Sequence, residues 1–251
     1  MAEDRSVLSR ASREPDLLLR YGDGAGQVAD GWVGPGGARG LPLVVLLHGG
    51  FWRPEYDRAH VRPMGEALCG AGWSVVSVEY RRVPGEPGSA TGDVRAALDL
   101  LPELFDGPQD GSMIVVGHSA GGHLALWASA AGAAAPALRA TVALAPVADL
   151  RLAHRLGLDG GAVADFLGVA PGTRPDLDPA RGESPAAPTV IFHGLDDRIV
   201  PIALSESYVT AHPSARLAPL PGAGHFALID PLTAAWARVL SGLRALSADH
   251  R

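Results

Sequence analysis

The stretch MIVVGHSAGGHLALWASA at residues 113–130 decides the fold. It begins with a short apolar, β-branched run of the kind that forms a buried strand, and it ends in residues at helical spacing. Between the two runs, residues 117–121 read GHSAG, which has the G-x-S-x-G pattern. This order predicts a strand, a sharp turn that exposes the hydroxyl of Ser119 above the sheet, and then a helix. The alternative interpretation of the pentapeptide is an ordinary glycine-rich turn.

Four similar apolar runs lie elsewhere in the chain. They are LPLVVLLHG from Leu41, WSVVSVEY from Trp73, ATVALAP from Ala140 and TVIFHG from Thr189. Near-continuous apolar runs of this length are typical of strands that are buried on both faces. Segments with helical spacing alternate with them, at residues 61–69, 91–105, 120–131, 202–211 and 231–246. The alternation predicts an α/β fold whose mostly parallel, doubly wound sheet carries helices on both faces.

The chain length of 251 residues fits one large α/β domain. Residues 1–40 are polar and rich in glycine, so we expect a lead-in segment that packs on the domain, with one strand around residues 27–33. Residues 41–251 then form the domain itself. About 40 residues rich in Gly, Pro and Asp separate two of the apolar runs. We expect a cap insertion there, at about residues 148–186, with a short helix at residues 162–167.

Composition and charge exclude several classes of protein. Apolar residues make up 47% and charged residues 19% of the chain, which excludes a disordered protein. The net charge is −6 and no basic stripe is present, so the chain lacks the electrostatic footprint of a nucleic-acid partner. No apolar stretch approaches the length of about 18 residues that spans a membrane. The first residues also lack the apolar run of a secretory signal, so we expect a cytoplasmic protein with no membrane partner.

Cys69 is the single cysteine of the chain. A disulfide within the chain and a zinc site built from cysteines are therefore excluded. Its place in a segment of helical spacing predicts a buried, inert thiol. The nine histidines show no H-E-x-x-H or comparable ligand spacing, so we expect no metal site.

A serine hydroxyl at such a turn needs a base, and the base needs an acid that orients it. On a sheet of this kind the order along the chain is Ser, then Asp or Glu, then His, each after a strand. Asp197 follows the run TVIFHG, and His225 lies in a turn-rich segment 28 residues later. We choose Asp197 as the acid because the spacing Asp-x-x-Val-Pro is typical of this loop. Asp196 and Asp149 remain the alternatives.

The fourth element is the sequence HGGFW at residues 48–52, directly after the first apolar run. Backbone amides of Gly50 and Phe51, together with the amide of Ala120, are placed to hold the oxyanion of a tetrahedral intermediate. The alternative is a plain turn between a strand and a helix. His48 is expected to brace this loop rather than to react.

These motifs, in the order HGGFW, GHSAGGHLAL, HGLDDRIVP and GAGH, resemble the α/β-hydrolase superfamily from about Leu41 to the C-terminus. Within it, a glycine pair followed by an aromatic residue and Trp52 is similar to the kynurenine formamidase (arylformamidase) branch and to small carboxylesterases. The resemblance implies an α/β-hydrolase fold and hydrolysis through an acyl-enzyme on Ser119. His225 would be the base and Asp197 the residue that orients it. It implies no cofactor, and a small ester or an aryl formamide as substrate.

Substrate contacts are expected from the loops at the same edge of the sheet. Trp52 can face an aromatic substrate or pack in the core, and Arg53 can bind a substrate carboxylate or lie in solvent. Phe166, in the cap insertion, is expected to close over the substrate. Arg81 and Arg82 follow an adjacent strand and carry the same two interpretations as Arg53.

Two other functions stay open at the level of sequence. One is a peptidase of the prolyl-oligopeptidase type, although the chain has no propeller domain and lacks that group's usual aromatic residue after the serine. The other is a binding protein that keeps the fold without catalysis. The sequence carries no signal for the oligomeric state.

Overall fold

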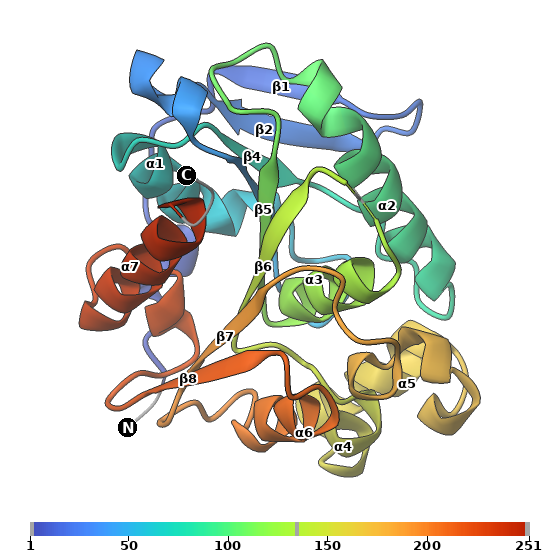
Figure 1. The fold of residues 1–251 in the computed structure, drawn as a ribbon. Coiled ribbons are helices and arrows are strands. Elements are labelled where there is room, and N and C mark those ends of the chain that lie inside the picture. Colours follow the sequence, from blue (N-terminus) through green and yellow to red (C-terminus); the bar gives the residue numbers. More distant parts are fainter. Residues whose placement is uncertain (1–2, 134–135, 249–251) are drawn as a thin grey trace.

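The computed structural model describes residues 3–133 and 136–248, and within them an eight-stranded sheet forms the centre (Figure 1). The order of the strands is β1-β2-β4-β3-β5-β6-β7-β8. The strands are β1 (Leu17–Arg20), β2 (Val28–Trp32), β3 (Leu43–Leu47), β4 (Val75–Val78), β5 (Met113–His118), β6 (Leu138–Leu144), β7 (Thr189–Gly194) and β8 (Arg216–Leu220). Strands β3 to β8 pair in parallel, while β1 and β2 pair antiparallel at one edge.

Helices cover both faces of the sheet (Figure 1). On one face lie α1 (Arg62–Gly70) and α7 (Ala234–Ala248), and on the other lie α2 (Pro87–Leu104), α3 (Ala120–Ala130) and α6 (Ala203–Ala211). Successive side chains of a strand point to opposite faces. Accordingly, Val44 packs in the core on the side of α1 and α7, and Val45 packs in the core on the side of α2 and α3. This double burial explains the near-continuous apolar runs of the sequence.

The cap segment follows β6. It contains α4 (Leu150–Arg155), α5 (Ala162–Leu167) and several short 3-10 turns. Figure 1 shows α4 and α5 beside α6, at one end of the molecule. The backbone N–H of Gly85 donates to the carbonyl of Asp165 at 2.7 Å, so the cap is joined to the loop that follows β4.

Each of the five apolar runs forms a strand, and the predicted helices correspond to α1, α2, α3, α5, α6 and α7. The patterns in the sequence did not predict β1, β8 or α4, and residues 17–32 join the sheet as two strands where one was expected. In the described part of the chain, no helix combines the length and the apolar character needed to cross a membrane.

Candidate active site

Ser119 stands on a strained turn between β5 and α3. Its backbone has φ 56° and ψ −116°, a conformation that side chains other than glycine rarely adopt. Such a conformation costs about 1–3 kcal/mol, so the surroundings must enforce it. The Ser119 N–H donates to the Leu144 carbonyl at 2.9 Å, and the Ser119 carbonyl accepts from the N–H of His123 at 3.0 Å. These bonds fix the turn to β6 on one side and to α3 on the other.

The two glycines of the pentapeptide are required by close backbone contacts. A Cβ atom at Gly117 would lie 2.2 Å from the carbonyl oxygen of Gly121, and a Cβ at Gly121 would lie 2.1 Å from that of Leu47. Both distances are far shorter than a real contact, and the obstacles are backbone atoms that cannot turn away. The turn that carries Ser119 therefore has no room for a side chain at either glycine of the G-x-S-x-G pattern.

Asp197 and His225 are brought together by the loops after β7 and β8. The Nδ1–H of His225 donates to Oδ2 of Asp197 at 2.6 Å. The other oxygen, Oδ1, accepts the backbone N–H groups of Ile199 and Val200, both at 2.8 Å. A neutral imidazole held through Nδ1–H in this way presents Nε2 as its acceptor nitrogen, which is the arrangement that a general base needs.

The carboxylate of Asp197 is ionised although its side chain is buried. Burial raises the pKa of Asp197, but the contacts with His193 and His225 and the two backbone N–H groups outweigh it and hold the pKa well below its usual range. His193 is itself fixed by Ser205, whose hydroxyl lies 2.7 Å from its Nδ1. In arrangements of this kind an ionised acid stabilises the protonated form of the histidine that it holds.

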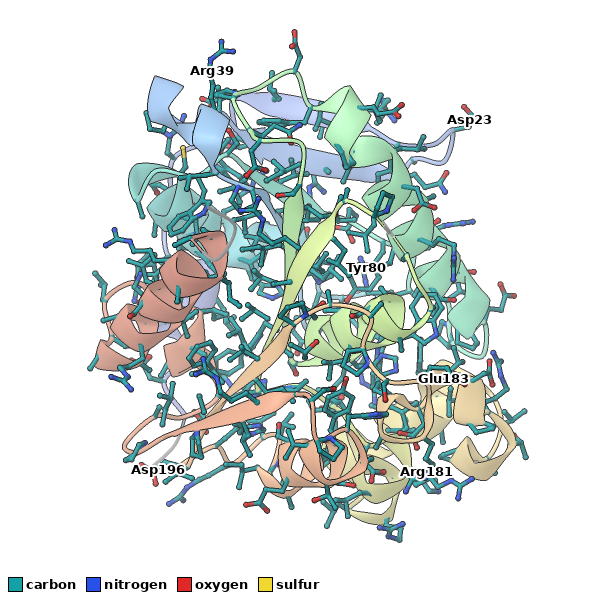
Figure 2. All side chains as sticks on the ribbon, in the orientation of Figure 1. Asp23, Arg39, Tyr80, Arg181, Glu183 and Asp196 are labelled. Atoms are coloured by element: carbon teal, nitrogen blue, oxygen red, sulfur yellow. The ribbon has the colours of Figure 1, made fainter. Side chains whose placement is uncertain are left out.

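The two alternative acids lie elsewhere. Asp196 is exposed, and Figure 2 shows it at the periphery of the molecule. Asp149 is buried but occupied: it accepts the N–H of Leu152 as the N-cap of α4, pairs with Arg181 at 2.8 Å and accepts the hydroxyl of Ser207 at 2.6 Å. Of the three candidates, the geometry brings Asp197 to His225.

The loop that follows β3 lies directly against Ser119. A Cβ at Gly49 would lie 3.0 Å from the Cβ of Ser119, so any larger residue there would push the two segments apart by a few tenths of an ångström. Gly50, Phe51 and Trp52 all have positive φ, of 114°, 50° and 56°. A run of three such residues turns the backbone sharply over the serine. Ala120, the first residue of α3, has one of the N–H groups that the helix itself leaves unpaired.

A cavity of about 350 Å³ opens onto these groups. Ser119, His225, Gly50 and Phe51 all line it. The rest of its wall consists of residues that the sequence analysis did not assign, namely Arg5, Leu8, Glu55, Tyr56, Asp57, Ala59, His60, His118, Asp159, Ile199 and Phe226. Burial lowers the pKa of His60 to about 4, so this histidine is neutral at physiological pH.

A buried network braces the loop after β3 from behind. His48 stacks on Tyr80 with ring centroids 4.4 Å apart, and the Tyr80 hydroxyl donates to the His48 carbonyl at 2.7 Å. Glu79 lies 3.2 Å from Nε2 of His48 and forms an ion pair with Arg82. Burial raises the pKa of Glu79, but the contacts with His48 and Arg82 outweigh it and place the pKa well below its usual range. The expected bracing role of His48 agrees with this geometry.

Replacing Glu79 with glutamine is expected to lower the free energy of unfolding by about 3 kcal/mol, because breaking a buried ion pair leaves the charge of Arg82 uncompensated. The folded-state pKa of Glu79 is lowered, so its contribution is complete above the ordinary pKa of 4.5 and is lost as the pH falls. Urea unfolding of parent and variant at several pH values measures the difference. Glu103→Gln, an exposed glutamate on α2, is the matched control and should change stability by less than about 0.5 kcal/mol. A difference that stays constant from about pH 7 to about pH 3 would contradict the assignment.

Trp52 and Phe166, expected at the substrate, belong to the core. Their rings stack with centroids 4.5 Å apart, and Trp52 also meets the edge of His123. Only 3% of Trp52 and 5% of Phe166 is exposed. Neither residue is among those that line the cavity at Ser119. Their contact instead fastens the cap to the loop after β3.

The arginines expected at the substrate are occupied by carboxylates. Arg53 pairs with Asp159 at 2.6 Å and with Asp165 at 3.1 Å, both in the cap segment. Arg81 pairs with the buried Asp93 at 2.7 Å, and Arg82 pairs with Glu79. These side chains are thus neither free to clamp a substrate nor simply solvated.

Metal ligands do not gather at this site. Within the residues that the structure describes, no three His, Cys, Asp or Glu side chains are grouped so that they could hold a metal ion.

Comparisons with known proteins agree with this architecture. The BD-FAE family model matches residues 32–143. A kynurenine formamidase of Salmo salar is 31% identical over 110 residues, which are 43% of this chain and 36% of that protein. The match therefore spans about a third of the relative's own length.

Solved structures match over almost the whole chain. Esterase B from Lactobacillus rhamnosis has a TM-score of 0.76 at 20% identity and covers 97% of this chain and 90% of its own. A phosphonylated esterase 2 from Thermogutta terrifontis has a TM-score of 0.72 at 20% identity, covering 91% and 93%. A truncated carbohydrate esterase from gut microbiota has a TM-score of 0.73 at 19% identity, covering 94% and 99%. The expected α/β-hydrolase fold is confirmed.

Proposed function

We propose that this chain, an α/β-hydrolase by its fold and its relatives, is a serine hydrolase that cleaves small carboxylic esters or aryl formamides. The observation that carries the proposal is that Ser119 and His225 line one cavity. His225 is held by Asp197 at 2.6 Å, and the glycine loop after β3 borders the same cavity. A nucleophile, a base, an orienting acid and backbone donors are the parts that acyl transfer needs.

The proposed catalytic cycle has two halves. His225 accepts the proton of the Ser119 hydroxyl through Nε2, and the serine oxygen attacks the acyl carbon. The amides of Gly50, Phe51 and Ala120 are the donors for the oxyanion, an effect worth about 3–4 kcal/mol per donor in a comparable case. The leaving group departs with the proton from His225, and water then repeats the steps on the acyl-enzyme to release the acid.

The cavity supports a small substrate. Its volume of about 350 Å³ is near the lower end of the range for small-molecule sites, roughly 300–1,000 Å³. Apolar wall comes from Leu8, Phe51, Ile199 and Phe226. A short acyl group or a single aromatic ring fits such a space.

The choice between ester and formamide is tested by one comparison of substrates. Purified enzyme is given N-formyl-L-kynurenine, p-nitrophenyl acetate and p-nitrophenyl butyrate, and kcat/KM is measured for each. A much higher kcat/KM for the formamide supports a formamidase, in line with the activity named for the salmon relative. Reaction with the esters alone supports a carboxylesterase. If none of the three is hydrolysed, the proposed function is contradicted.

Among the residues that the structure describes, Arg5 is the arginine that lines the cavity, whereas Arg53, Arg81 and Arg82 are paired with carboxylates. If N-formyl-L-kynurenine is a substrate, its carboxylate has Arg5 as the available cation. Arg5→Ala should then raise KM for this substrate about tenfold, because a charge-assisted hydrogen bond is lost. KM for the uncharged p-nitrophenyl acetate should not change.

The control for this prediction is Arg39→Ala, which removes an exposed arginine that does not line the cavity (Figure 2). It should leave both KM values as they are. An equal rise of both KM values in the Arg5 variant would show that Arg5 supports the shape of the cavity rather than a substrate charge.

A further inference from the structure

The N-terminal segment ends in a contact with the loops that carry Asp197 and His225. Oε1 of Glu3 accepts the backbone N–H of Arg198 at 3.0 Å, and Oε2 accepts the backbone N–H of His225, also at 3.0 Å. A single carboxylate thus joins the residue after Asp197 to His225 itself.

The protein leaves room for this carboxylate at position 224. A Cβ at Gly224 would lie 2.3 Å from Oε2 of Glu3, within the space that the carboxylate now fills. Gly224 directly precedes His225 in the chain. Glycine at this position therefore lets the Glu3 side chain reach the backbone of the histidine loop.

Other contacts hold the N-terminal segment in place. Val7 is 2% exposed and packs in the core on the side of α1 and α7. Arg10 binds both carboxylate oxygens of Asp230, shortly after the histidine loop. The guanidinium of Arg5 lies 5.5 Å from the centroid of the Phe226 ring. These contacts hold the N-terminal segment against the loop that carries His225. Arg5 and Leu8 of the same segment line the cavity.

We propose that Glu3 is a positioning residue for the Asp197–His225 pair, an inference that rests on the proposed serine hydrolase function. The two loops come from different strands, and the Glu3 carboxylate fixes their separation through two hydrogen bonds to charge. Without it the His225 backbone can shift relative to Asp197 and Ser119. A displacement of about 1 Å at a reacting group can cost about 100-fold in rate.

The test compares three variants with the parent enzyme on the best ester or formamide substrate. Glu3→Ala should lower kcat by about 10- to 100-fold with KM unchanged, because substrate binding does not involve Glu3. Glu3→Gln keeps one acceptor oxygen, so its kcat should lie between those of Glu3→Ala and the parent. Asp4→Ala is the matched control: Asp4 is exposed and accepts the Ser6 N–H within its own segment, at 2.9 Å. Its kcat should equal that of the parent.

Two readouts separate positioning from stability and from the proposed function. If Glu3→Ala lowers Tm but leaves kcat of the folded enzyme unchanged, Glu3 has a structural role and the inference is wrong. Proton NMR of the His225 Nδ1–H, observed downfield when it is bound to Asp197, needs no substrate. A shift or broadening of this resonance in Glu3→Ala, absent in Asp4→Ala, supports the inference. An unchanged resonance overturns it, whereas an inactive parent enzyme overturns the proposed function.

Discussion

Ser119→Ala is expected to lower kcat by about 10⁶-fold on any substrate that the parent enzyme hydrolyses. Removing the nucleophile of a triad abolishes the covalent route, and the rate that remains comes from binding and from the oxyanion donors. The variant should also fail to form an acyl-enzyme. Mass spectrometry of protein quenched soon after mixing with p-nitrophenyl acetate should show an acetylated parent and an unmodified variant.

Ser129→Ala provides the matched control for this experiment. Ser129 lies on the same helix, α3, is 1% exposed and makes no side-chain hydrogen bond within the described residues. Losing its hydroxyl should leave kcat unchanged. If Ser119→Ala keeps more than about 1% of the parent activity, Ser119 is not the nucleophile. Undiminished ligand binding with no turnover in either protein would instead favour a binding protein with this fold.

The glycine loop, Ser119 and Asp197 of the candidate site could be predicted because each follows a buried strand in a fixed order, whereas His225 was predicted from its place in that order and from the turn-rich segment before it. The apolar runs of β3, β5 and β7 are continuous, so their ends are visible in the sequence. The carboxyl ends of parallel strands meet at one edge of a sheet, which brings the residues after them together. The backbone contacts at Gly117 and Gly121 explain why both positions of the G-x-S-x-G pattern need glycine.

The edge strands could not be predicted for a physical reason. β8 is largely half-buried or exposed and contains Pro219, and β1 alternates between half-buried and exposed residues. Neither segment has the apolar run that marks a strand buried on both faces. Strand β8 forms by pairing with β7, and β1 forms by pairing with β2. Pairing of this kind leaves no local pattern in the sequence.

The functions expected of individual arginines and aromatic residues could not be settled from sequence either. Arg53 is separated from its partner Asp159 by 106 positions, and Trp52 stacks on a residue in the distant cap. Glu3 lies 222 positions before His225. A side chain's partner across such distances depends on the tertiary fold, so its role stays open until the fold is known.

Asp197→Asn is expected to lower kcat by about 10⁴-fold while leaving the structure intact. Asn is nearly the same size as Asp, so the hydrogen bonds to the N–H groups of Ile199 and Val200 can persist. The amide carries no charge, and it can donate to Nδ1 of His225, which would place the imidazole proton on the wrong nitrogen. A comparable substitution in another serine hydrolase costs about this factor. Steady-state kinetics at neutral pH, with Tm measured in parallel, test the prediction.

The neighbouring acid makes this test specific. Asp196→Asn removes the same charge one position earlier, from an exposed side chain, and should leave kcat within about twofold of the parent. The two variants have the same net charge, so a difference between them cannot arise from the overall field. Equal losses in both would mean that the loop after β7 acts only through its charge. A large loss in Asp196→Asn alone would transfer the orienting role to Asp196 and would contradict the 2.6 Å contact between Asp197 and His225 as the functional one.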